Sequence, residues 1–485
     1  MTSVAPESSV SPDSPVPAAG NGSGAQSALP GARRRTAWAE GLDRLRAAAT
    51  TEPGRLRAIG AVLALLVVVF GAATAWQVSA RSAAADDVVL RSQPLTADAA
   101  SIYRSLADAD TTAAAGFLAG GAESETTRKR YAADLATASQ LLVKAAANTQ
   151  MPGAHSGAAD PAGAQIARLN QLLPRYAGLV ETARTNNRQG LPLGGAYLRY
   201  ANEQMRTELL PAAQALYEAE TERLAADHER AAAWPWWALA AGGVAIGALA
   251  WAQRRDRRRT NRVVNRGLLA AAVASAAVLL WLVTGHALAR AGLADAYAHG
   301  ARSLEVLNTA RIDALRARGD ENLTLVARGA VLTKDQKDFY EVDFQAGMAD
   351  LAGAAGPGPA AAAGELGKAL ALADDEAGRR PVRDAVAAVR EWRARHAEAR
   401  AADDRGDYER ALAKVIGGDG ATGASFDRVD TGLGRALVHE QERFRAAADG
   451  GRAAFGGLAV GAGVLAAAAA AAAVLGIGRR LSEYR

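Results

Sequence analysis

Long uncharged blocks and long charged blocks alternate along this chain. Four stretches of 22 to 26 residues contain no charged side chain: residues 58–80, 231–252, 267–289 and 453–478. A helix rises about 1.5 Å per residue, so each stretch is long enough to cross a hydrocarbon core about 30 Å thick. The pattern therefore predicts four transmembrane helices.

Between these spans, apolar residues recur at alternating steps of three and four, the spacing of one helix face packed in a bundle. Residues 81–230 contain three breaks, at 119–124, 151–163 and 186–195, and should form four helices. No segment shows a sustained period of two, so we predict no sheet. The predicted seams are Tyr131, Leu135, Ala138 and Leu142 in the second helix, Ile166, Leu169, Leu173, Tyr176, Val180 and Ala183 in the third, and Met205, Leu209, Ala213 and Leu216 in the fourth.

Residues 290–452 repeat this plan. A shift of 209 residues aligns Ser124 with Thr333, and both are expected to be helix N-caps, with Gln336 completing a capping box after Thr333. A shift of 216 residues aligns the turns at 184–190 and 400–406. The second copy is less regular because breaks are expected at 355–359, 378–381 and 417–423. The chain therefore reads as an internal duplication of a membrane helix pair that carries a four-helix bundle.

The charge distribution predicts the orientation in the membrane. Arginines exceed acidic residues in three short segments: seven to five in 1–57, seven to one in 253–266, and three to one in 479–485. Short basic segments stay in the cytoplasm, whereas long domains are translocated largely regardless of charge. We therefore expect a multi-pass protein of the cell membrane with both termini cytoplasmic and with 81–230 and 290–452 extracytoplasmic. The expected fold class is an all-α membrane protein with four transmembrane helices and two extracytoplasmic four-helix bundles.

The N-terminal region should add little ordered structure. Residues 1–32 are rich in Pro, Ser, Gly and Ala and cannot bury a core, so we expect disorder there. Residues 33–57 fit either a short amphipathic helix on the membrane surface or an unstructured stop-transfer cluster. A cleaved signal peptide is not expected, because the first apolar stretch begins more than 50 residues from the terminus.

Composition and motifs argue against an enzyme. The net charge of +5 comes from the cytoplasmic edges, and no basic stripe is interleaved with aromatic residues, so nucleic acid is not an expected partner. The six histidines form no HExxH motif, and the GxGxxG pattern at 418–423 follows no strand. The cytoplasmic segments are too short for a kinase, cyclase or phosphatase fold. We expect no catalytic residue, no cofactor and no metal.

Two features of the spans suggest helix packing and signal transmission. Gly243 with Gly247 and Gly457 with Gly461 form GxxxG pairs, which let helices approach closely, although such pairs also arise by chance in a Gly- and Ala-rich chain. They leave a homodimer open as an oligomeric state. The helices that lead into the second and fourth spans, at 218–230 and 438–454, are expected to continue into the membrane as stiff rods. Such rods would transmit a shift, or else form a static stalk.

Two segments carry a resemblance to a known family. PLTADAASIYRSLADADTTAAAGFLAGG at 94–121 and ARIDALRARGDENLTLVARG at 310–329, with the four-span layout, resemble the actinobacterial GlnX family of membrane proteins. The resemblance implies a relay of extracytoplasmic amino-acid availability (glutamate, glutamine or aspartate). In that family an extracytoplasmic solute-binding lipoprotein is the input partner, and the cytoplasmic serine/threonine kinase PknG is the output partner.

Charged residues within these two segments are the candidate docking or coupling surface. Solvated helix faces with charge pairs one turn apart are the ordinary alternative for each of them. The arginines of the central loop should contact the lipid bilayer first and a cytoplasmic partner second. The docking candidates are Arg104, Asp108, Asp110, Arg318, Asp320 and Glu321, and the loop candidates are Arg254, Arg255, Arg257, Arg258 and Arg259.

Three functions remain open from the sequence. The first is a non-enzymatic relay between a binding lipoprotein and a kinase. The second is a chemoreceptor-like sensor that binds a small ligand directly, because paired helical bundles also resemble chemoreceptor ligand domains. The third is a structural scaffold of the cell envelope. Ligand binding by the isolated protein would favour the second, and unchanged kinase signalling after gene deletion would favour the third.

Overall fold

The structure, a computed structural model, describes residues 52–120, 123–149, 160–260, 265–354 and 363–482. The chain divides into two units, residues 1–58 and 59–485, and the described part of the first is only the beginning of one helix. The expected disorder at 1–32 and most of the surface helix at 33–57 lie outside the described residues. Within the described ranges there is no strand, only one isolated bridge between Leu332 and Asp338. The predicted all-α fold is confirmed.

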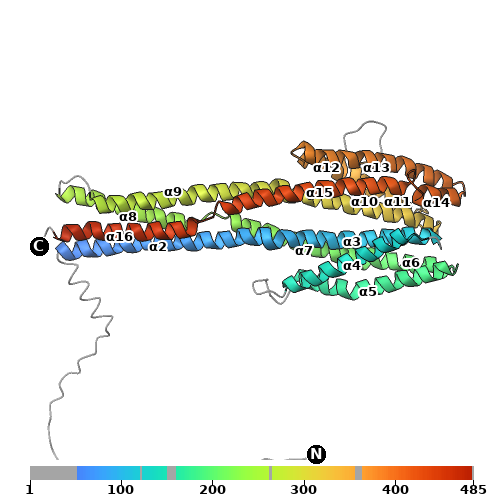
Figure 1. Cartoon of the computed structure of the whole chain (residues 1–485), viewed down its shortest axis with the longest axis horizontal. Coiled ribbons are helices and arrows are strands. Elements are labelled where there is room, and N and C mark those ends of the chain that lie inside the picture. Colours follow the sequence, from blue (N-terminus) through green and yellow to red (C-terminus); the bar gives the residue numbers. More distant parts are fainter. Residues whose placement is uncertain (1–51, 121–122, 150–159, 261–264, 355–362, 483–485) are drawn as a thin grey trace, which may run out of the picture. The chain divides into compact units, whose positions relative to one another are not determined.

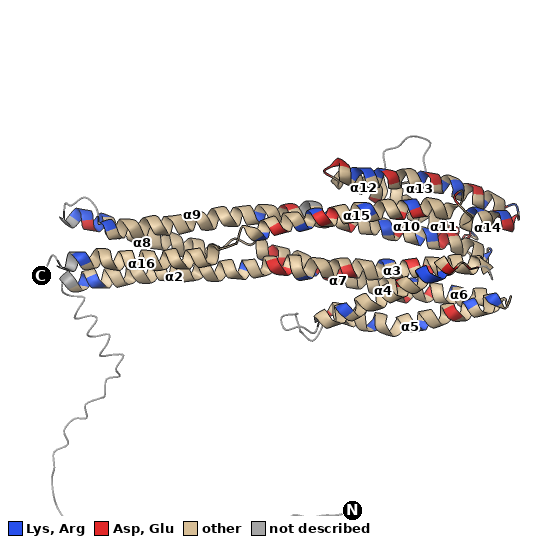
Figure 2. Ribbon diagram, in the orientation of Figure 1, with Lys and Arg blue, Asp and Glu red and all other residues tan. Residues whose placement is uncertain are grey.

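Four helices are long and apolar enough to cross a membrane, as predicted, so the chain is a multi-pass membrane protein. They are α2 (Glu52–Asp87), α8 (Trp236–Thr260), α9 (Arg266–Asp295) and α16 (Leu458–Ser482). Figure 2 shows these helices almost free of charged residues along most of their length, with basic residues clustered near one end.

The first bundle follows α2 without interruption. Its helices are a π-helical segment η1 (Val88–Ser92), α3 (Gln93–Leu118), α4 (Glu125–Thr149), α5 (Pro161–Arg188), α6 (Leu193–Gln204), a π-helical segment η3 (Met205–Leu209) and α7 (Leu210–Ala232). The seams predicted for the third and fourth helices are buried throughout, and in the second helix Leu135 alone is only half-buried. Ser124 is the predicted N-cap of α4, because its hydroxyl accepts a hydrogen bond from the Thr127 amide at 3.0 Å.

The second bundle follows α9 in the same way. It consists of a π-helical segment η4 (Ala296–Ala301), α10 (Arg302–Ala327), α11 (Phe339–Ala352), α12 (Gly364–Leu372), α13 (Glu376–Asp403), α14 (Tyr408–Ile416) and α15 (Thr422–Ala453). The break expected at 378–381 is wrong, because α13 begins at Glu376 and continues through Pro381, which lies inside the helix. The GxGxxG pattern at 418–423 lies at the turn before α15, as predicted.

The capping box predicted at Thr333 is also wrong. The helix begins six residues later at Phe339, and Asp338 is its N-cap, accepting a hydrogen bond from the Glu341 amide at 3.0 Å. Thr333 lies instead in a tight hairpin, in which its amide donates to the Lys337 carbonyl at 2.8 Å. Gln336 has a positive φ of 59°, which is incompatible with the first turn of a helix.

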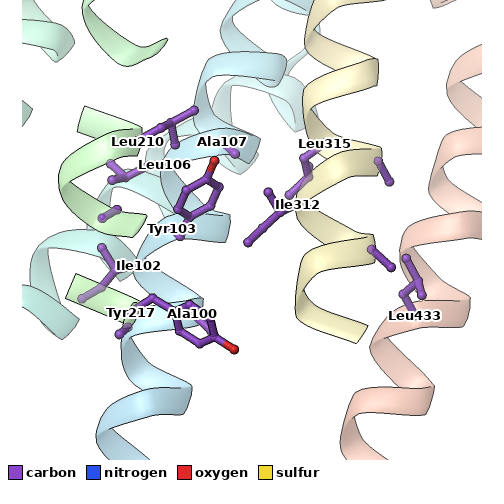
Figure 3. Close-up of a cluster of buried hydrophobic side chains, with 14 of the residues drawn as sticks. Ala100, Ile102, Tyr103, Leu106, Ala107, Leu210, Tyr217, Ile312, Leu315 and Leu433 are labelled. Carbon is purple, nitrogen blue, oxygen red and sulfur yellow. The ribbon is translucent and has the colours of Figure 1, made fainter. Parts of the chain in front are cut away.

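The two bundles share one hydrophobic core. Figure 3 shows Tyr103 and Leu106 of α3 and Leu210 of α7 on one side, and Ile312 and Leu315 of α10 on the other. All of these side chains belong to one buried cluster that extends from α3 to α15. The two lobes therefore lie side by side along α3 and α10 (Figure 1). A movement of one bundle must displace the other, because close-packed cores resist independent movement.

The helices expected to continue into the second and fourth spans are interrupted. The uninterrupted helices instead connect the first and third spans to the bundles. Helix α2 runs through η1 into α3, and α9 runs through η4 into α10, without a break. Between α7 and α8 the helix stops at 233–235, because Pro235 supplies no amide hydrogen and disfavours a helical residue before it. Between α15 and α16 it stops at 454–457, where Gly457 has φ 72°.

Candidate functional site

The six docking candidates do not form an exposed surface. Four of them, Asp110, Arg318, Asp320 and Glu321, are buried, and Arg104 and Asp108 are half-buried. The prediction that these residues are exposed for docking is therefore wrong for the four buried ones, and their role in coupling stays a prediction. The physical reason is that α3 and α10 are the central helices of the two bundles and pack against each other as well as against their own bundles.

Asp108 and Arg104 lie at the side of the contact between the bundles. Arg130 of α4 makes two hydrogen bonds to Asp108, at 3.0 and 3.1 Å, and also reaches Asp427 of α15 at 3.5 Å. Burial and the neighbouring Arg311 lower the pKa of Arg104 to about 10. These contacts join the bundles at their surface, where ion pairs contribute little to stability.

Arg318 and Glu321 belong to a largely buried network in the second bundle. Glu321 accepts hydrogen bonds from Arg318 at 2.5 Å, from the Trp392 indole at 3.1 Å and from His396 at 2.9 Å. The other ring nitrogen of His396 lies 3.1 Å from Glu341. Burial would lower the pKa of His396, but the two carboxylates outweigh burial and raise it to about 9. Every charge in this network has a partner, so its role is to hold α10, α11 and α13 together.

Asp110 and Asp320 line a cavity of about 350 Å³ between the bundles. It lies where α3, α6, η3 and α7 of the first bundle meet α10 and α11 of the second. Five aspartates and two arginines line it, together with one asparagine. The polar lining residues are Asp110, Asn202, Arg206, Asp313, Arg316, Asp320, Asp343 and Asp350. We call this cavity the inter-bundle pocket.

Arg206 connects the two bundles across the inter-bundle pocket. Its guanidinium donates to Asp320 of α10 at 2.9 Å and also to Asp343 of α11. The same guanidinium lies 5.0 Å from the centre of the Phe339 ring, within range of a cation–π contact. Burial raises the pKa of Asp320 to about 7, although Arg206 opposes this shift.

Asp110 has only neutral hydrogen-bond donors. The Tyr176 hydroxyl donates to it at 3.0 Å and the Asn202 amide at 2.6 Å. Burial raises its pKa to about 6, against the effect of these hydrogen bonds. Burial likewise raises the pKa of Asp313 to about 6. A folded protein holds carboxylates at raised pKa at a cost in stability, and such groups are concentrated at functional sites.

Asn202, Arg206 and Asp343 were not expected from the sequence. They carry no motif, and Arg206 is one of many arginines on amphipathic helices. The spacing of Asp110 from Asn202 is 92 residues, and that of Arg206 from Asp320 is 114. Packing within the first bundle brings Asn202 to Asp110, and packing between the bundles brings Arg206 to Asp320 and Asp343.

A second cavity of about 340 Å³ lies between the bundles, next to the π-helical segment η4. Its lining is mixed, with Tyr217, Tyr297 and Phe444 among the apolar residues and Gln93 and Glu305 among the polar ones. π-Helical segments are frequent at functional sites, because the extra residue per turn redirects side chains.

The breaks at the ends of the spans are held by side chains from the continuous helices. Arg81 of α2 donates to the Ala233 carbonyl at 2.7 Å and to the Trp234 carbonyl at 2.9 Å, and Gln77 accepts from the Ala238 amide at 2.9 Å. His286 of α9 is buried between the rings of Trp234 and Phe455. These residues form a junction where the spans meet the bundles.

The GxxxG glycines do not pack as expected within the chain. A Cβ added at Gly243 or Gly247 has no atom within 4 Å, and Gly457 lies in the turn before α16. Gly461 alone is close to a neighbour, the Trp281 ring. A close backbone contact lies elsewhere, between Gly267 of α9 and Gly476 of α16, which face each other, whereas a Cβ at Gly243 or Gly247 meets no neighbour.

The loop arginines lie on a helix. Helix α8 continues to Thr260, so Arg254, Arg255, Arg257 and Arg258 extend from its last turns; the side chain of Arg259 is outside the described residues. The Arg255 guanidinium lies 5.3 Å from the centre of the Trp251 ring.

Among the described residues, no group of three or more His, Cys, Asp or Glu side chains is arranged to hold a metal ion.

Comparison with known proteins adds one family. Residues 84–229 match the family described as an actinobacterial sensor domain. The match covers the first bundle from η1 to α7, except for the last three residues of α7. No curated protein and no solved structure matches the chain. The match supports an actinobacterial sensor protein and leaves its stimulus and partners open.

Proposed function

We propose that the protein is a transmembrane sensor without an enzymatic output of its own. The observation that carries the proposal is the position of α3 and α10. Each continues unbroken from a membrane span, and the two face each other across the inter-bundle pocket. A stimulus that changes the distance or angle between the bundles would therefore act directly on α2 and α9. The sensor-domain match to 84–229 supports the same role.

The junction suggests how the movement would be transmitted. Two spans are rigid extensions of the bundles, whereas the other two are separated from them by the breaks at 233–235 and 454–457. Breaks of this kind act as hinges, so α2 and α9 would slide or tilt relative to α8 and α16. Arg81 ties α2 to the first break and would pass its displacement to α8.

The orientation and partners follow from charge and resemblance. Basic residues at the ends of α8 and α16 and in the segment between α8 and α9 support a cytoplasmic location for that side of the cell membrane, with both bundles outside. The resemblance to GlnX implies an extracytoplasmic solute-binding lipoprotein as the input partner and a cytoplasmic serine/threonine kinase as the output partner. In this proposal the stimulus is the availability of glutamate, glutamine or aspartate.

A direct small-molecule sensor is the second candidate. The inter-bundle pocket favours it, because a cavity of about 350 Å³ lined by charged groups is within the size range of small-molecule sites. A purely structural scaffold does not explain why carboxylates of raised pKa are kept at the contact between the bundles. The two sensor versions share the same output and differ in what binds outside.

A deletion strain tests the proposal. Kinase-substrate phosphorylation should change when amino acids are shifted in the wild type, and the response should be lost in the deletion strain. Complementation with Arg206→Ala, which breaks the contact between the bundles, should restore less than half of the response. Complementation with Lys129→Ala, which removes an exposed pair with Glu125, should restore it fully. An unchanged response in the deletion strain would exclude the kinase relay.

A further inference from the structure

The inter-bundle pocket has more negative than positive groups. Five aspartates face two arginines, and both arginines are already engaged. Arg206 pairs with Asp320 and Asp343, and Arg316 donates to the Tyr103 hydroxyl. Asp110 has no cationic hydrogen-bond partner. Lys368, which pairs with Glu365, adds a positive charge near Asp313 and Asp350. The carboxylates that line the pocket still outnumber its lining cations five to two.

The carboxylates are arranged in two levels. Asp320 and Asp343 share Arg206 at one level. Asp313 and Asp350 influence each other at the second level, next to Arg316. The two levels are seven residues apart on both α10 and α11, which corresponds to about 10 Å along the helix axes. Asp110 and Asn202 extend the first level from the opposite bundle.

Asn202 supplies an observation independent of the charges. Its side chain is 4% exposed and lines the pocket, and its amide nitrogen donates to Asp110, but its carbonyl oxygen Oδ1 has no hydrogen-bond partner among the residues that the structure describes. A buried acceptor without a donor is costly and uncommon in folded proteins. The unpartnered group is an acceptor beside carboxylates, so the ligand that fits must bring hydrogen-bond donors and positive charge.

We propose that the inter-bundle pocket binds a small linear diammonium compound, one ammonium group at each carboxylate level. One ammonium would donate to Asp110, Asp320 and Asn202 Oδ1, and the other to Asp313 and Asp350. Aliphatic diamines of four or five carbons and dibasic amino acids carry two amino groups at a comparable separation. An acidic amino acid would be repelled by the excess of carboxylates.

Such a ligand also accounts for the raised pKa of the carboxylates. Burial favours the protonated forms of Asp110, Asp313 and Asp320. Arg206 opposes this effect at Asp110 and Asp320, and Arg316 also opposes it at Asp320, where Asp343 and Asp110 add to it. At Asp313 the effect is opposed by Arg316 and Lys368 and increased by Asp350 and Glu365. An ammonium group would stabilise the ionised forms, so binding would release protons and strengthen as pH rises from 5.5 to 8. Binding of the ligand would also draw α3 and α10 together, because the first carboxylate level contains groups from both bundles.

The inference deepens the proposed sensor function by naming what the pocket binds, and binding can be measured whether or not the protein signals. The experiment is calorimetry on the full-length chain in lipid nanodiscs, at pH 7.5 and 0.15 M NaCl. The probes are 1,5-diaminopentane, 1,4-diaminobutane and lysine. The controls are 1-aminopentane, glutamate, glutamine and MgCl₂. We expect one site per chain, at least tenfold tighter binding of a diammonium probe than of the monoamine, and no binding of glutamate.

Variants locate the site. Asp320→Asn, Asp350→Asn and Asn202→Ala should each weaken diamine binding at least tenfold, whereas Asp335→Asn, in the exposed hairpin before α11, should not change it. Asp350 is exposed at the edge of the pocket, so its variant keeps the test valid if Asp320→Asn fails to fold. Equal affinity for monoamine and diamine, binding of glutamate, or unchanged binding in Asp350→Asn and Asn202→Ala would overturn the inference.

The two proposals fail separately. If diamines bind but the kinase-substrate response to amino acids is unchanged in the deletion strain, the ligand inference stands and the sensor function falls. If the response to amino acids depends on this chain but no diammonium compound binds, the sensor function stands and the ligand inference falls.

Discussion

Arg206 of the first bundle and Asp320 of the second are joined by an ion pair of 2.9 Å at the wall of the inter-bundle pocket. Both side chains are largely shielded from water, with 28% and 11% of their surface exposed. The pair comes from helices that follow two different membrane spans. It is therefore both a contact that holds the bundles together and a point where a ligand can change their relationship.

Removal of Arg206 should destabilise the protein. Arg206→Ala leaves Asp320 buried without its cation, and removing one partner of such a pair costs about 2 to 4 kcal/mol. The thermal unfolding midpoint of the full-length chain in detergent should fall clearly. Lys129→Ala is the control, because Lys129 and Glu125 are about three-quarters exposed and their pair contributes little. Equal midpoints for the two variants would contradict this reading.

The network around His396 predicts a loss of stability at alkaline pH. The folded pKa of His396 is about 9 and its unfolded pKa is about 6.5, so its contribution is fully present below pH 6.5 and is lost as pH rises through 9. Glu321, Glu341 and the stacked Phe344 ring surround it. In His396→Gln the unfolding midpoint should be lower than in the wild type at pH 6. The difference should shrink by pH 10, and a difference independent of pH would contradict the prediction.

The raised pKa of Asp320 predicts a second pH dependence of stability, in a lower pH range. Its pKa is about 7 when folded and about 3.9 when unfolded, so the folded state binds more protons. Its contribution is fully present below pH 4 and is lost as pH rises through 7. Arg206, Asp343, Asp110 and Arg316 are the charged groups that face it. Subtracting the unfolding midpoints of Asp320→Asn from those of the wild type between pH 4 and 8 should show this loss, and a flat difference would refute it.

The contact between Gly267 and Gly476 predicts which glycines of the spans tolerate a side chain. A Cβ at Gly267 would lie 2.4 Å from the Cα of Gly476 and 2.5 Å from the Ala472 carbonyl oxygen, so Gly267→Ala must push α9 and α16 apart. We expect a loss of about 1 to 3 kcal/mol. The matched controls are Gly243→Ala and Gly247→Ala, where a Cβ meets nothing within 4 Å.

Gly243→Ala and Gly247→Ala should have the thermal unfolding midpoint of the wild type in detergent, and they should migrate on gels as the wild type does. If Gly247→Ala is the destabilised variant instead, the outward face of α8 is a contact between two copies of the chain. That outcome would restore the GxxxG pair as a dimer motif.

Loss of Arg81 should loosen the junction. Arg81→Ala removes the donors to the Ala233 and Trp234 carbonyls, which lie at the membrane edge where few water molecules can replace them. Amide hydrogen exchange in the peptide covering 228–240 should become at least tenfold faster. Arg91→Ala, which removes an exposed pair with Asp87, is the control and should leave that exchange rate unchanged. Unchanged exchange in Arg81→Ala would show that the break is held by packing alone.

Much of the fold was predictable because its causes are local in the sequence. The length of an uncharged stretch sets whether a helix can cross a membrane, and steps of three and four define a helix face. The seam from Ile166 to Ala183 is buried as predicted. The start of α11 was mispredicted because Thr333 and Gln336 match a capping pattern, whereas the hairpin and Asp338 provide the actual cap.

The candidate site was less predictable. Asp110, Asp320 and Glu321 were predicted to lie on an exposed docking or coupling surface, and the structure shows them buried. In the sequence, two charged residues one helical turn apart give the same pattern whether the helix face is exposed to solvent or buried. The partners that distinguish the two cases, Asn202 and Arg206, come from another helix 92 and 114 residues away.

Composition and periodicity alone establish four membrane helices, two helical bundles and the side on which the basic residues gather, because transfer into lipid and burial of a helix face depend on neighbouring residues in one segment. Other features are decided only by the tertiary structure. They are the core shared by α3 and α10, the inter-bundle pocket with the Asn202 oxygen, and the identity of the spans that continue unbroken into the bundles. Packing between distant segments depends on shape and on side-chain partners, and neither leaves a periodic signal along the chain.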